Sequence, residues 1–362
     1  MHLIVDAHED LAYNAAYFGR DYTRSALVTR QLERNGPVPQ RNGNTLLGLP
    51  EFLQAQVAVI FSTLFAAPAR QQQTEAPFTK TYTTAQEAHD LANAQMDYYY
   101  QLVDENEQFE LIGSRGDLDR VLATWAAPEP AGRRVGLVPL MEGADPIREP
   151  QEAEWWMERG VRIVGLAWGA TRFAGGTGAP GPLTADGRRL LDVMAELGLI
   201  LDLSHSSDES FLGALDHFQG TVIVSHANAR ALMDGFARPE RMLTDEMIRR
   251  AAEAGAVIGV VPYNNFLKAD YKPSDGKAAV TLSAVLDMID HICQVTGSAA
   301  HAGLGTDFDG GFGVERVPAE IDTIVDLHKL DGALQARGYS EPDIAGILGQ
   351  NWIGVLRRGL PA

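Results

Sequence analysis

Three of the nine histidines, His8, His205 and His226, stand where an apolar run of sequence gives way to a polar loop. His8 follows the run LIVDA, and the other two end the runs LILDLSH and VIVSH, so a Ser-His pair recurs in two neighbouring segments. One such histidine alone is most often a packed, hydrogen-bonded core residue. Three in equivalent positions favour a shared metal ion, for which imidazole nitrogen is the commonest protein ligand.

Three carboxylates stand at comparable points of the sequence: Asp10, Glu142 and Asp307. Successive side chains of a strand alternate between its faces, so His8 and Asp10, two residues apart, are expected on the same side. Glu142 ends the apolar run RVGLVPLME, and Asp307 follows GLGT, whose glycines let the backbone approach a ligand closely. Taken singly each is a weak signal, because acidic residues are usually solvated. Together the six side chains offer nitrogen and oxygen donors without a thiolate, which suits zinc, manganese or iron.

These side chains can meet only if the fold brings strand ends together. Short apolar runs alternate with helical periodicity along the chain, which is typical of repeated β-α units around a parallel sheet. Eight strands are expected, ending near His8, Phe65, Glu142, Trp168, His205, His226, Tyr263 and Asp307. In a barrel all such ends open on one face, which holds the active site. The sequence therefore predicts an α/β protein, a (β/α)8 TIM barrel forming one domain over residues 1–362.

Helical periodicity predicts helices over five ranges, 84–105, 183–197, 208–218, 245–254 and 282–295. Two stretches interrupt the alternation of strands and helices. Residues 19–50 are rich in Arg, Asn, Gly and Pro, and residues 66–83 are rich in Gln, Thr and Pro. Because both follow early strands, we expect them to overhang the C-terminal face of the barrel as inserted loops or lids.

The composition restricts the partners that the protein can have. Acidic side chains outnumber basic ones by 48 to 30, which gives a formal net charge of −18. Such a surface repels phosphate backbones and anionic lipids, so nucleic acids and membranes are not expected partners. The segment MHLIVDAHEDL lacks the features of a signal peptide, and no stretch approaches the roughly 20 apolar residues that span a bilayer. We therefore expect a cytoplasmic protein that acts on a small molecule.

The segments DAHED, MEGADPI, LDLSHSS, VIVSHANAR, YNN and HAGLGTDFDG, in this order, resemble the renal (membrane) dipeptidase family of metallopeptidases, within the amidohydrolase superfamily. The segment GQNW at residues 349–352 resembles the family as well, so the resemblance covers nearly the whole chain. It implies hydrolysis of the amide bond of dipeptides or similar small amides. It also implies two divalent metal ions as cofactors, with zinc as the first expectation.

The resemblance assigns the metal ligands residue by residue. His8 and Asp10 match ligands of one zinc, His205 and His226 match ligands of the second, and Glu142 matches the carboxylate that bridges both. The resemblance implies a hydroxide shared by two ions about 3.5–4 Å apart, which is a nucleophile near neutral pH.

Three further residues match positions that act on the substrate. Asp307 matches an acidic residue beside the bridging water, which implies that it delivers a proton to the leaving amine. Arg241, in RMLTD, resembles the arginine that binds the terminal carboxylate of the substrate, a contact that suits a planar guanidinium. Tyr263, in YNN, resembles a tyrosine that assists at the same carboxylate. Arg238 and Arg230 remain open as alternative anchors.

One position departs from the family. After its fourth strand the family has a histidine that donates a hydrogen bond to the tetrahedral intermediate, and here the run RIVGLAW places Trp168. An indole donates through one N–H of fixed aim, and losing one preorganised donor costs roughly 10²–10³ in turnover. We expect Trp168 in the substrate site, where it either packs against an apolar side chain of a different substrate or slows hydrolysis of unsubstituted dipeptides.

Two other functions stay open at this point. One is another metal-dependent amidohydrolase reaction, on a lactone or a phosphoester, and the other is a weakly active substrate-binding relative. Arg241 favours a substrate with a carboxylate, whereas a phosphoester site is expected to place more basic residues on the strand-end loops. Trp168 favours the binding protein, but the five intact ligand positions argue against it. The family resemblance also makes a homodimer an expectation, without indicating an interface.

Overall fold

The computed structural model describes residues 2–71, 80–127 and 130–362. Its strands are β1 (Ile4–Glu9), β2 (Val57–Phe65), β3 (Ala67–Pro68), β4 (Thr81–Tyr82), β5 (Phe109–Leu111), β6 (Val135–Glu142), β7 (Ile163–Gly165), β8 (Ile200–Asp202), β9 (Val222–Ile223), β10 (Ile258–Val260) and β11 (Ala302–Leu304). Eight of them pair in parallel in the order β10-β11-β1-β2-β6-β7-β8-β9, and a parallel bridge between Val224 and Ile258 joins the two ends. The predicted (β/α)8 barrel is confirmed.

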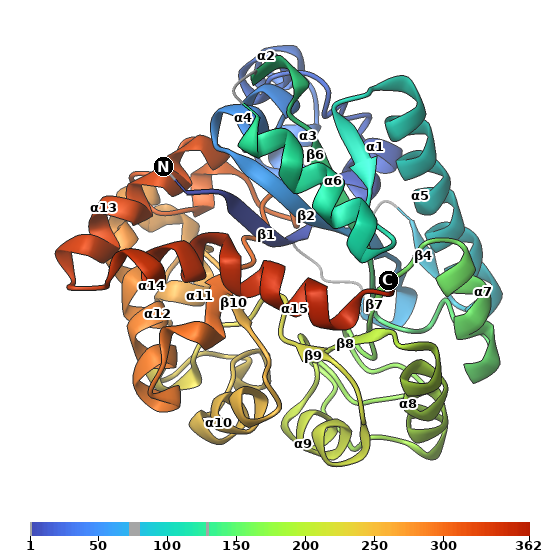
Figure 1. Ribbon diagram of the computed structural model, residues 1–362. Helices are drawn as coiled ribbons and strands as arrows, with labels where there is room; N and C mark the ends of the chain where they lie inside the picture. The colour runs from blue at the N-terminus through green and yellow to red at the C-terminus, as the bar shows by residue number, and fades with distance from the viewer. Residues whose placement is uncertain (1, 72–79, 128–129) are drawn as a thin grey trace.

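Helices surround these strands (Figure 1). They are α1 (Leu11–Phe18), α2 (Ala26–Glu33), α3 (Val38–Asn42), α4 (Leu49–Gln54), α5 (Ala85–Glu105), α6 (Arg115–Ala126), α7 (Ala153–Glu158), α8 (Ala185–Leu197), α9 (Asp208–His217), α10 (Asp245–Glu253), α11 (Asn264–Leu267), α12 (Leu282–Thr296), α13 (Lys329–Ala336), α14 (Glu341–Ala345) and α15 (Asn351–Gly359). The five predicted helices are α5, α8, α9, α10 and α12, each within two residues at either end. Among the described residues, no helix is long and apolar enough to cross a membrane.

Local chemistry explains where the long helices begin and end. Before α5, the side chain of Thr84 accepts a hydrogen bond from the Glu87 amide, and the Glu87 carboxylate accepts one from the Thr84 amide. This reciprocal capping box satisfies two amides that a helix start leaves unpaired. Gly198 and Gly297 end α8 and α12 with φ angles of 69° and 70°, a left-handed conformation that costs glycine little.

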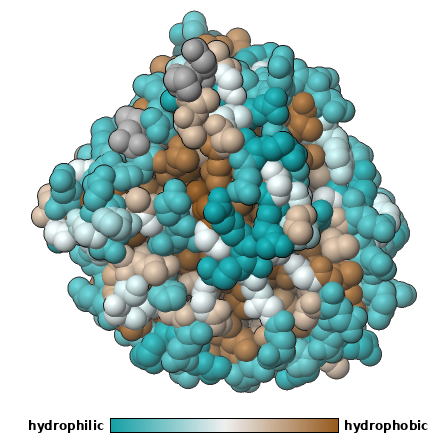
Figure 2. All heavy atoms as spheres, viewed as in Figure 1, coloured by the Kyte–Doolittle hydropathy of each residue, from teal (hydrophilic) through white to brown (hydrophobic). Residues whose placement is uncertain are grey.

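Helix α15 closes one end of the barrel, as Figure 1 shows. Trp352 is fully buried, packs edge-to-face against Phe61 of β2 at a ring distance of 5.3 Å, and donates its indole N–H to the Leu304 carbonyl. Asn351 donates to the carbonyls of Ala299 and Ala302. The GQNW segment therefore supports the strands at the closed end, and its role is structural. On the same face, Figure 2 shows hydrophilic residues over most of the periphery and hydrophobic patches toward the middle.

The strands on one side of the barrel are shorter than the apolar runs predict. β7, β8, β9, β10 and β11 each stop three residues before the polar residue at which a strand was expected to end. Those residues, Trp168, His205, His226, Tyr263 and Asp307, lie on the loops that leave the strands. Ladder pairing stops early because the chain turns to point these side chains over the rim.

Candidate metal and substrate site

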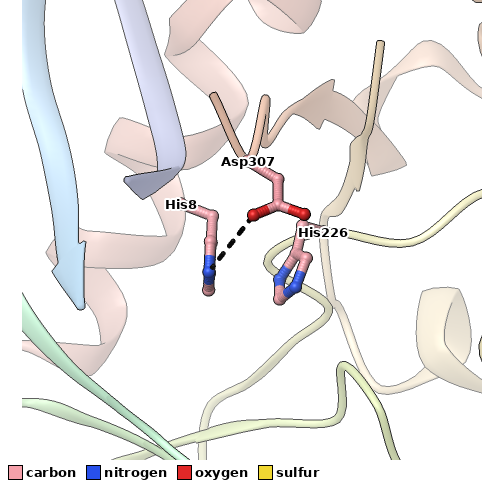
Figure 3. A group of neighbouring side chains, drawn as sticks. All are labelled: His8, His226 and Asp307. Atoms are coloured by element: carbon pink, nitrogen blue, oxygen red, sulfur yellow. Dashed lines mark ion pairs between the residues drawn. The ribbon is translucent and has the colours of Figure 1, made fainter. Parts of the chain in front are cut away.

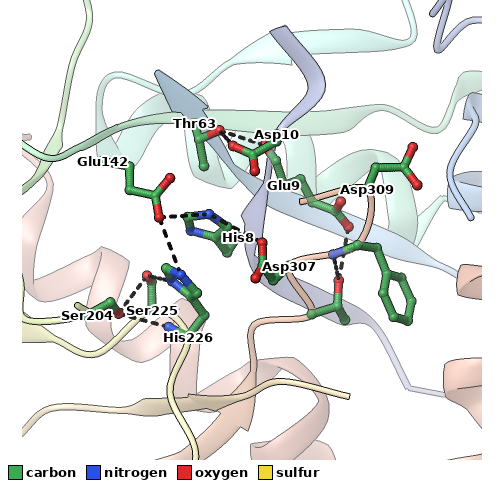
Figure 4. Close-up of polar contacts among 12 residues, drawn as sticks. His8, Glu9, Asp10, Thr63, Glu142, Ser204, Ser225, His226, Asp307 and Asp309 are labelled. Carbon is green, nitrogen blue, oxygen red and sulfur yellow. Dashed lines mark hydrogen bonds and ion pairs between the residues drawn. The ribbon is translucent and has the colours of Figure 1, made fainter. Parts of the chain in front are cut away.

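Glu142, the last residue of β6, lies at the centre of the three strand-end histidines. Its Oε1 atom is 3.1 Å from Nε2 of His205, 3.5 Å from Nε2 of His226 and 3.6 Å from Nε2 of His8. The Nε2 atoms of His205 and His226 are themselves 3.0 Å apart. Figure 4 shows Glu142 directed at His8 and His226 from across the barrel. Three histidines that are far apart in the sequence therefore place their Nε2 atoms around one carboxylate oxygen of Glu142.

The donor atoms form three overlapping groups, within each of which they lie no more than 4.8 Å apart. One group is His8, Asp10 and Glu142, and a second is Glu142, His205 and His226. The third is His8, His226 and Asp307, with Asp307 3.9 Å from His8 (Figure 3). The first two groups contain the residues that the sequence assigned to two separate ions, and Glu142 is common to both.

The chemistry of these side chains fits divalent cations. His8 is fully buried, yet neither of its ring nitrogens has a hydrogen-bond partner among the described residues, which leaves both available as ligands. Burial lowers the pKa of His8 to about 3 and lowers the pKa values of His205 and His226 well below the usual value. Neutral imidazole is the form that binds a metal.

The pKa values of the buried carboxylates are shifted in the opposite direction, upward. Burial and the nearby charge of Asp10 raise the pKa values of Glu142 and Asp307 well above their usual range. Burial, with a contribution from Asp309, raises the pKa of Asp10 to about 6. Buried like charges at this separation are unfavourable unless a cation offsets them. The residues present therefore fit a site for divalent metal ions.

An irregularity in β1 orients the first ligand pair. Between the pairs Asp6–Ile60 and Glu9–Ser62, β1 has one more residue than β2, which is a bulge. Bulges change the direction of a side chain near functional sites. The strand ends at Glu9, and Asp10 is the N-cap of α1 with φ −86° and ψ 44°, so the expected alternation along a regular strand was the wrong reason for grouping His8 with Asp10.

Two of the site residues adopt a left-handed backbone conformation that non-glycine residues seldom take. The φ angles are 63° at His205 and 57° at Asp307. Each such residue costs of order 1–3 kcal/mol and persists where the surrounding structure imposes it, often at functional sites. At these two strand ends, the left-handed conformation helps to set the direction of the His205 and Asp307 side chains.

Behind the two Ser-His pairs lies a buried carboxylate that the sequence reasoning missed. Asp202 accepts hydrogen bonds from the amides and hydroxyls of both Ser204 and Ser225. The Ser225 hydroxyl also lies 2.8 Å from Nδ1 of His226, and Nδ1 of His205 lies 2.9 Å from the Thr177 hydroxyl. Such outer contacts fix the orientation of a ligating imidazole. The repeated Ser before His was the available signal.

Above the metal-binding groups opens a cavity of about 740 Å³. Seven of the nine predicted site residues line it: Asp10, Glu142, Trp168, His205, Arg241, Tyr263 and Asp307. The other two, His8 and His226, are 0 % and 1 % exposed and lie outside the cavity lining. A volume of this size accommodates a small molecule.

Arg241 is buried in the wall of this cavity. One guanidinium nitrogen donates to the His226 carbonyl, and two others, Nε and Nη2, have no hydrogen-bond partner among the described residues. Phe266 lies beneath the guanidinium at 5.0 Å. Burial lowers the pKa of Arg241 to about 10, so the group stays charged at neutral pH. A buried cation with free donors is suited to an anionic substrate group.

The two alternative anchors differ in position. Arg230 pairs with Asp208 and donates to the Met242 carbonyl, outside the cavity lining, so the structure does not support it as an anchor. Arg238 lines the cavity. Tyr263 also lines it, stacked on Phe312 at 4.1 Å.

Trp168 forms part of an aromatic wall on the His205 side of the cavity. Its ring centroid is 5.9 Å from that of His205 and 5.1 Å from that of Phe65. Tyr13 and Phe18 continue the wall. Trp168 therefore lines the cavity beside His205.

The insertion at residues 19–50 reaches the opposite rim. It folds into α2, α3 and the first residues of α4 and not into the expected irregular loop, and residues 39–43 line the cavity. Of the second insertion, residues 66–83, the described part contains β3 and β4, and residues 72–79 lie outside the described residues. Arg70 of this insertion lines the cavity, where it pairs with Asp145 at 3.0 Å.

A parallel barrel with neutral imidazoles and carboxylates converging at the carboxyl ends of its strands defines a metal-dependent barrel enzyme. The model of the membrane dipeptidase family, peptidase family M19, matches residues 1–359, and the chain belongs to this family. The protein is a metal-dependent dipeptidase.

The chain is also similar in sequence to other proteins, and it shares its fold with solved structures. An uncharacterized protein encoded near pqqA in Klebsiella pneumoniae is 31% identical over 248 residues, which span 66% of this chain and 83% of that protein. A crystal structure of a dipeptidase of family M19 superposes with a TM-score of 0.77 at 24% identity, covering 100% and 99% of the two chains. A Rhodobacter sphaeroides metallopeptidase, solved with a phosphinate mimic of L-Ala-D-Ala, gives 0.76 at 22% identity over 99% of each chain.

Proposed function

We propose that the protein is a binuclear zinc dipeptidase that hydrolyses the amide bond of dipeptides or similar small amides. The observation that carries this proposal is the position of Glu142, whose Oε1 atom lies 3.1–3.6 Å from three imidazole nitrogens. In the proposal, His8 and Asp10 bind one zinc, His205 and His226 bind the other, and Glu142 contacts both. When bound, the two cations supply an activated water and polarise the scissile carbonyl.

The side chains around the cations would place the substrate. We assign the terminal carboxylate of the dipeptide to Arg241, whose Nε and Nη2 atoms lack partners in the described part of the chain, with Tyr263 assisting. Asp307, which lines the cavity 3.9 Å from His8, would deliver a proton to the leaving amine. Trp168 would cover the other side of the substrate. This arrangement sets the amide bond between Arg241 and the aromatic wall.

The experiment that tests the function removes and restores the metal. The protein is stripped with a chelator, reloaded with zinc or manganese, and assayed on L-L, L-D and glycyl dipeptides. We expect hydrolysis that the chelator abolishes and the metal restores, with two ions bound per chain by elemental analysis. A reloaded protein that binds one ion, or that cleaves none of the dipeptides, would contradict the proposal.

A further inference from the structure

Five arginines, Arg41, Arg70, Arg238, Arg241 and Arg316, line the cavity of a protein whose net charge is −18. They are one-sixth of all its basic residues (5 of 30), gathered in one cavity. The family resemblance accounts for Arg241 alone. A basic cavity in an acidic protein concentrates anionic ligands, so an arginine of this cavity without a carboxylate partner is suited to bind one.

Arg238 and Arg316 differ from the arginines that have a structural role. Within the described ranges, neither forms an ion pair with a carboxylate, whereas Arg70 pairs with Asp145 at 3.0 Å. Both are half-buried. The side-chain hydrogen bond of Arg316 is a long one, 3.4 Å from Nη1 to the Tyr263 hydroxyl. Two partly desolvated guanidinium groups without a counterion are unfavourable unless a ligand supplies the negative charge.

The acidic residues of the cavity wall do not supply it. Asp10 and Glu142 belong to the groups proposed to hold cations, and Asp307 lies 3.9 Å from His8. The fourth carboxylate, Glu315, accepts hydrogen bonds from the amide and side chain of Asn44. None of these carboxylates forms an ion pair with Arg238 or Arg316 within the described ranges, so both guanidinium groups are open to an anionic ligand.

Tyr263 connects these two arginines to the proposed carboxylate anchor. Its ring packs edge-to-face on Phe266 at 4.8 Å, and Arg241 stacks on the same Phe266 ring. Arg238 lines the same cavity as Arg241 and Tyr263. A second anionic group bound by Arg238 and Arg316 would thus lie in the same cavity as the carboxylate bound by Arg241.

We propose that Arg238 and Arg316 form a second carboxylate subsite and that the preferred substrates are dipeptides with a C-terminal aspartate or glutamate. The proposal rests on the proposed function, because it takes Arg241 as the anchor of the α-carboxylate. Arg241 binds that group, and the other two guanidinium groups bind the side-chain carboxylate. A charge-assisted contact of this kind contributes enough to change affinity by roughly tenfold or more.

The test compares two substrates that differ by one charge. With metal-loaded protein, we expect kcat/KM for glycyl-glutamate to exceed that for glycyl-glutamine by roughly tenfold. In the double variant Arg238→Gln/Arg316→Gln this ratio should fall to about one. The matched control is Arg357→Gln, an exposed arginine of α15 paired with Asp119 on the helical surface, which removes a positive charge and should keep the wild-type ratio.

A binding measurement separates failure of the subsite from failure of the enzyme. Isothermal titration of the same protein with L- and D-glutamate and with the matching glutamines requires no turnover. If neither dipeptide is cleaved, the proposed function fails. The subsite is still supported if the protein binds glutamate more tightly than glutamine and the double variant loses this difference. Equal kcat/KM values for glycyl-glutamate and glycyl-glutamine, together with equal binding of glutamate and glutamine, overturn the proposed subsite. Faster cleavage of glycyl-O-phosphoserine than of glycyl-glutamate overturns it in favour of a phosphate-bearing ligand.

Discussion

The Nε2 atoms of His205 and His226 lie 3.0 Å apart, and both face Oε1 of Glu142. Burial lowers the pKa values of both histidines well below the usual value and so favours neutral imidazole, the form that binds a metal. A cation between the two rings and the carboxylate satisfies all three groups at once. Glu142 should therefore decide whether the metal stays bound.

We predict that Glu142→Ala removes both proposed ions together, because its carboxylate belongs to both candidate ligand groups. Metal content is measured by elemental analysis after gel filtration of protein loaded with zinc. Glu341→Ala, at a position 72 % exposed, is the matched control and should keep the wild-type content. A Glu142→Ala protein that retains two tightly held ions would show that this carboxylate does not bridge them.

A second prediction concerns the support of His226. The Ser225 hydroxyl connects Asp202 to Nδ1 of His226, so Ser225→Ala leaves the imidazole free to turn. We expect zinc affinity to fall by about 10–100-fold and stability by about 1 kcal/mol. Competition with a chromophoric chelator measures the affinity.

The control for Ser225 is Ser298→Ala. Ser298 caps a short helical turn by accepting from the Ala300 amide, away from the metal-binding groups. Losing such a cap costs about 1 kcal/mol as well, but zinc affinity should not change. Equal losses of affinity in the two variants would mean that Ser225 acts through general stability.

The sequence predicts where the candidate ligands lie relative to the strands because its signals are local. An apolar run followed by a histidine or carboxylate identifies a strand and its end within a few residues, and the barrel then brings all such ends to one rim. This reasoning places Glu142 correctly at the last residue of β6. It fails on the backbone beyond the strands: the bulge in β1 and the left-handed conformations of His205 and Asp307 depend on neighbouring strands, which no local pattern encodes.

The insertion at residues 19–50 shows the same limit on a larger scale. Its Arg, Asn, Gly and Pro content predicts a loop, yet it contains α2, α3 and the first residues of α4. They are held by residues distant in the sequence: Asp309 accepts from the Tyr22 hydroxyl at 2.9 Å and from the Leu46 amide at 3.0 Å. These contacts join positions 287 and 263 residues apart, so composition alone cannot reveal them.

A third prediction follows from Trp168, which lines the cavity beside His205. Replacing it with histidine, Trp168→His, restores the hydrogen-bond donor found in the family and should raise kcat on unsubstituted dipeptides, by up to roughly 10². Trp155→His is the matched control, because Trp155 is 37 % exposed on α7 and packs against His89 and Trp156. If kcat of Trp168→His equals or falls below that of the wild type, the indole contributes to the active site and does not reduce activity.

The last prediction concerns Asp309, which joins the insertion to the loop after β11. Its buried carboxylate pairs with Arg20 at 2.9 Å, and Arg20 is itself 3 % exposed. Removing one partner of a buried ion pair costs about 3–5 kcal/mol, so we expect Asp309→Ala to lower the free energy of unfolding by that amount. The Asp309 φ angle is 63°, and Asp309→Asn separates loss of the charge from backbone strain, because asparagine tolerates this conformation but carries no charge.

The control is Asp322→Ala, which breaks an ion pair whose acidic side chain is 64 % exposed and should cost about 0–1 kcal/mol. Guanidinium unfolding at fixed zinc concentration measures all three, and an Asp309→Asn protein as stable as the wild type would show that the charge of this carboxylate does not hold the insertion in place.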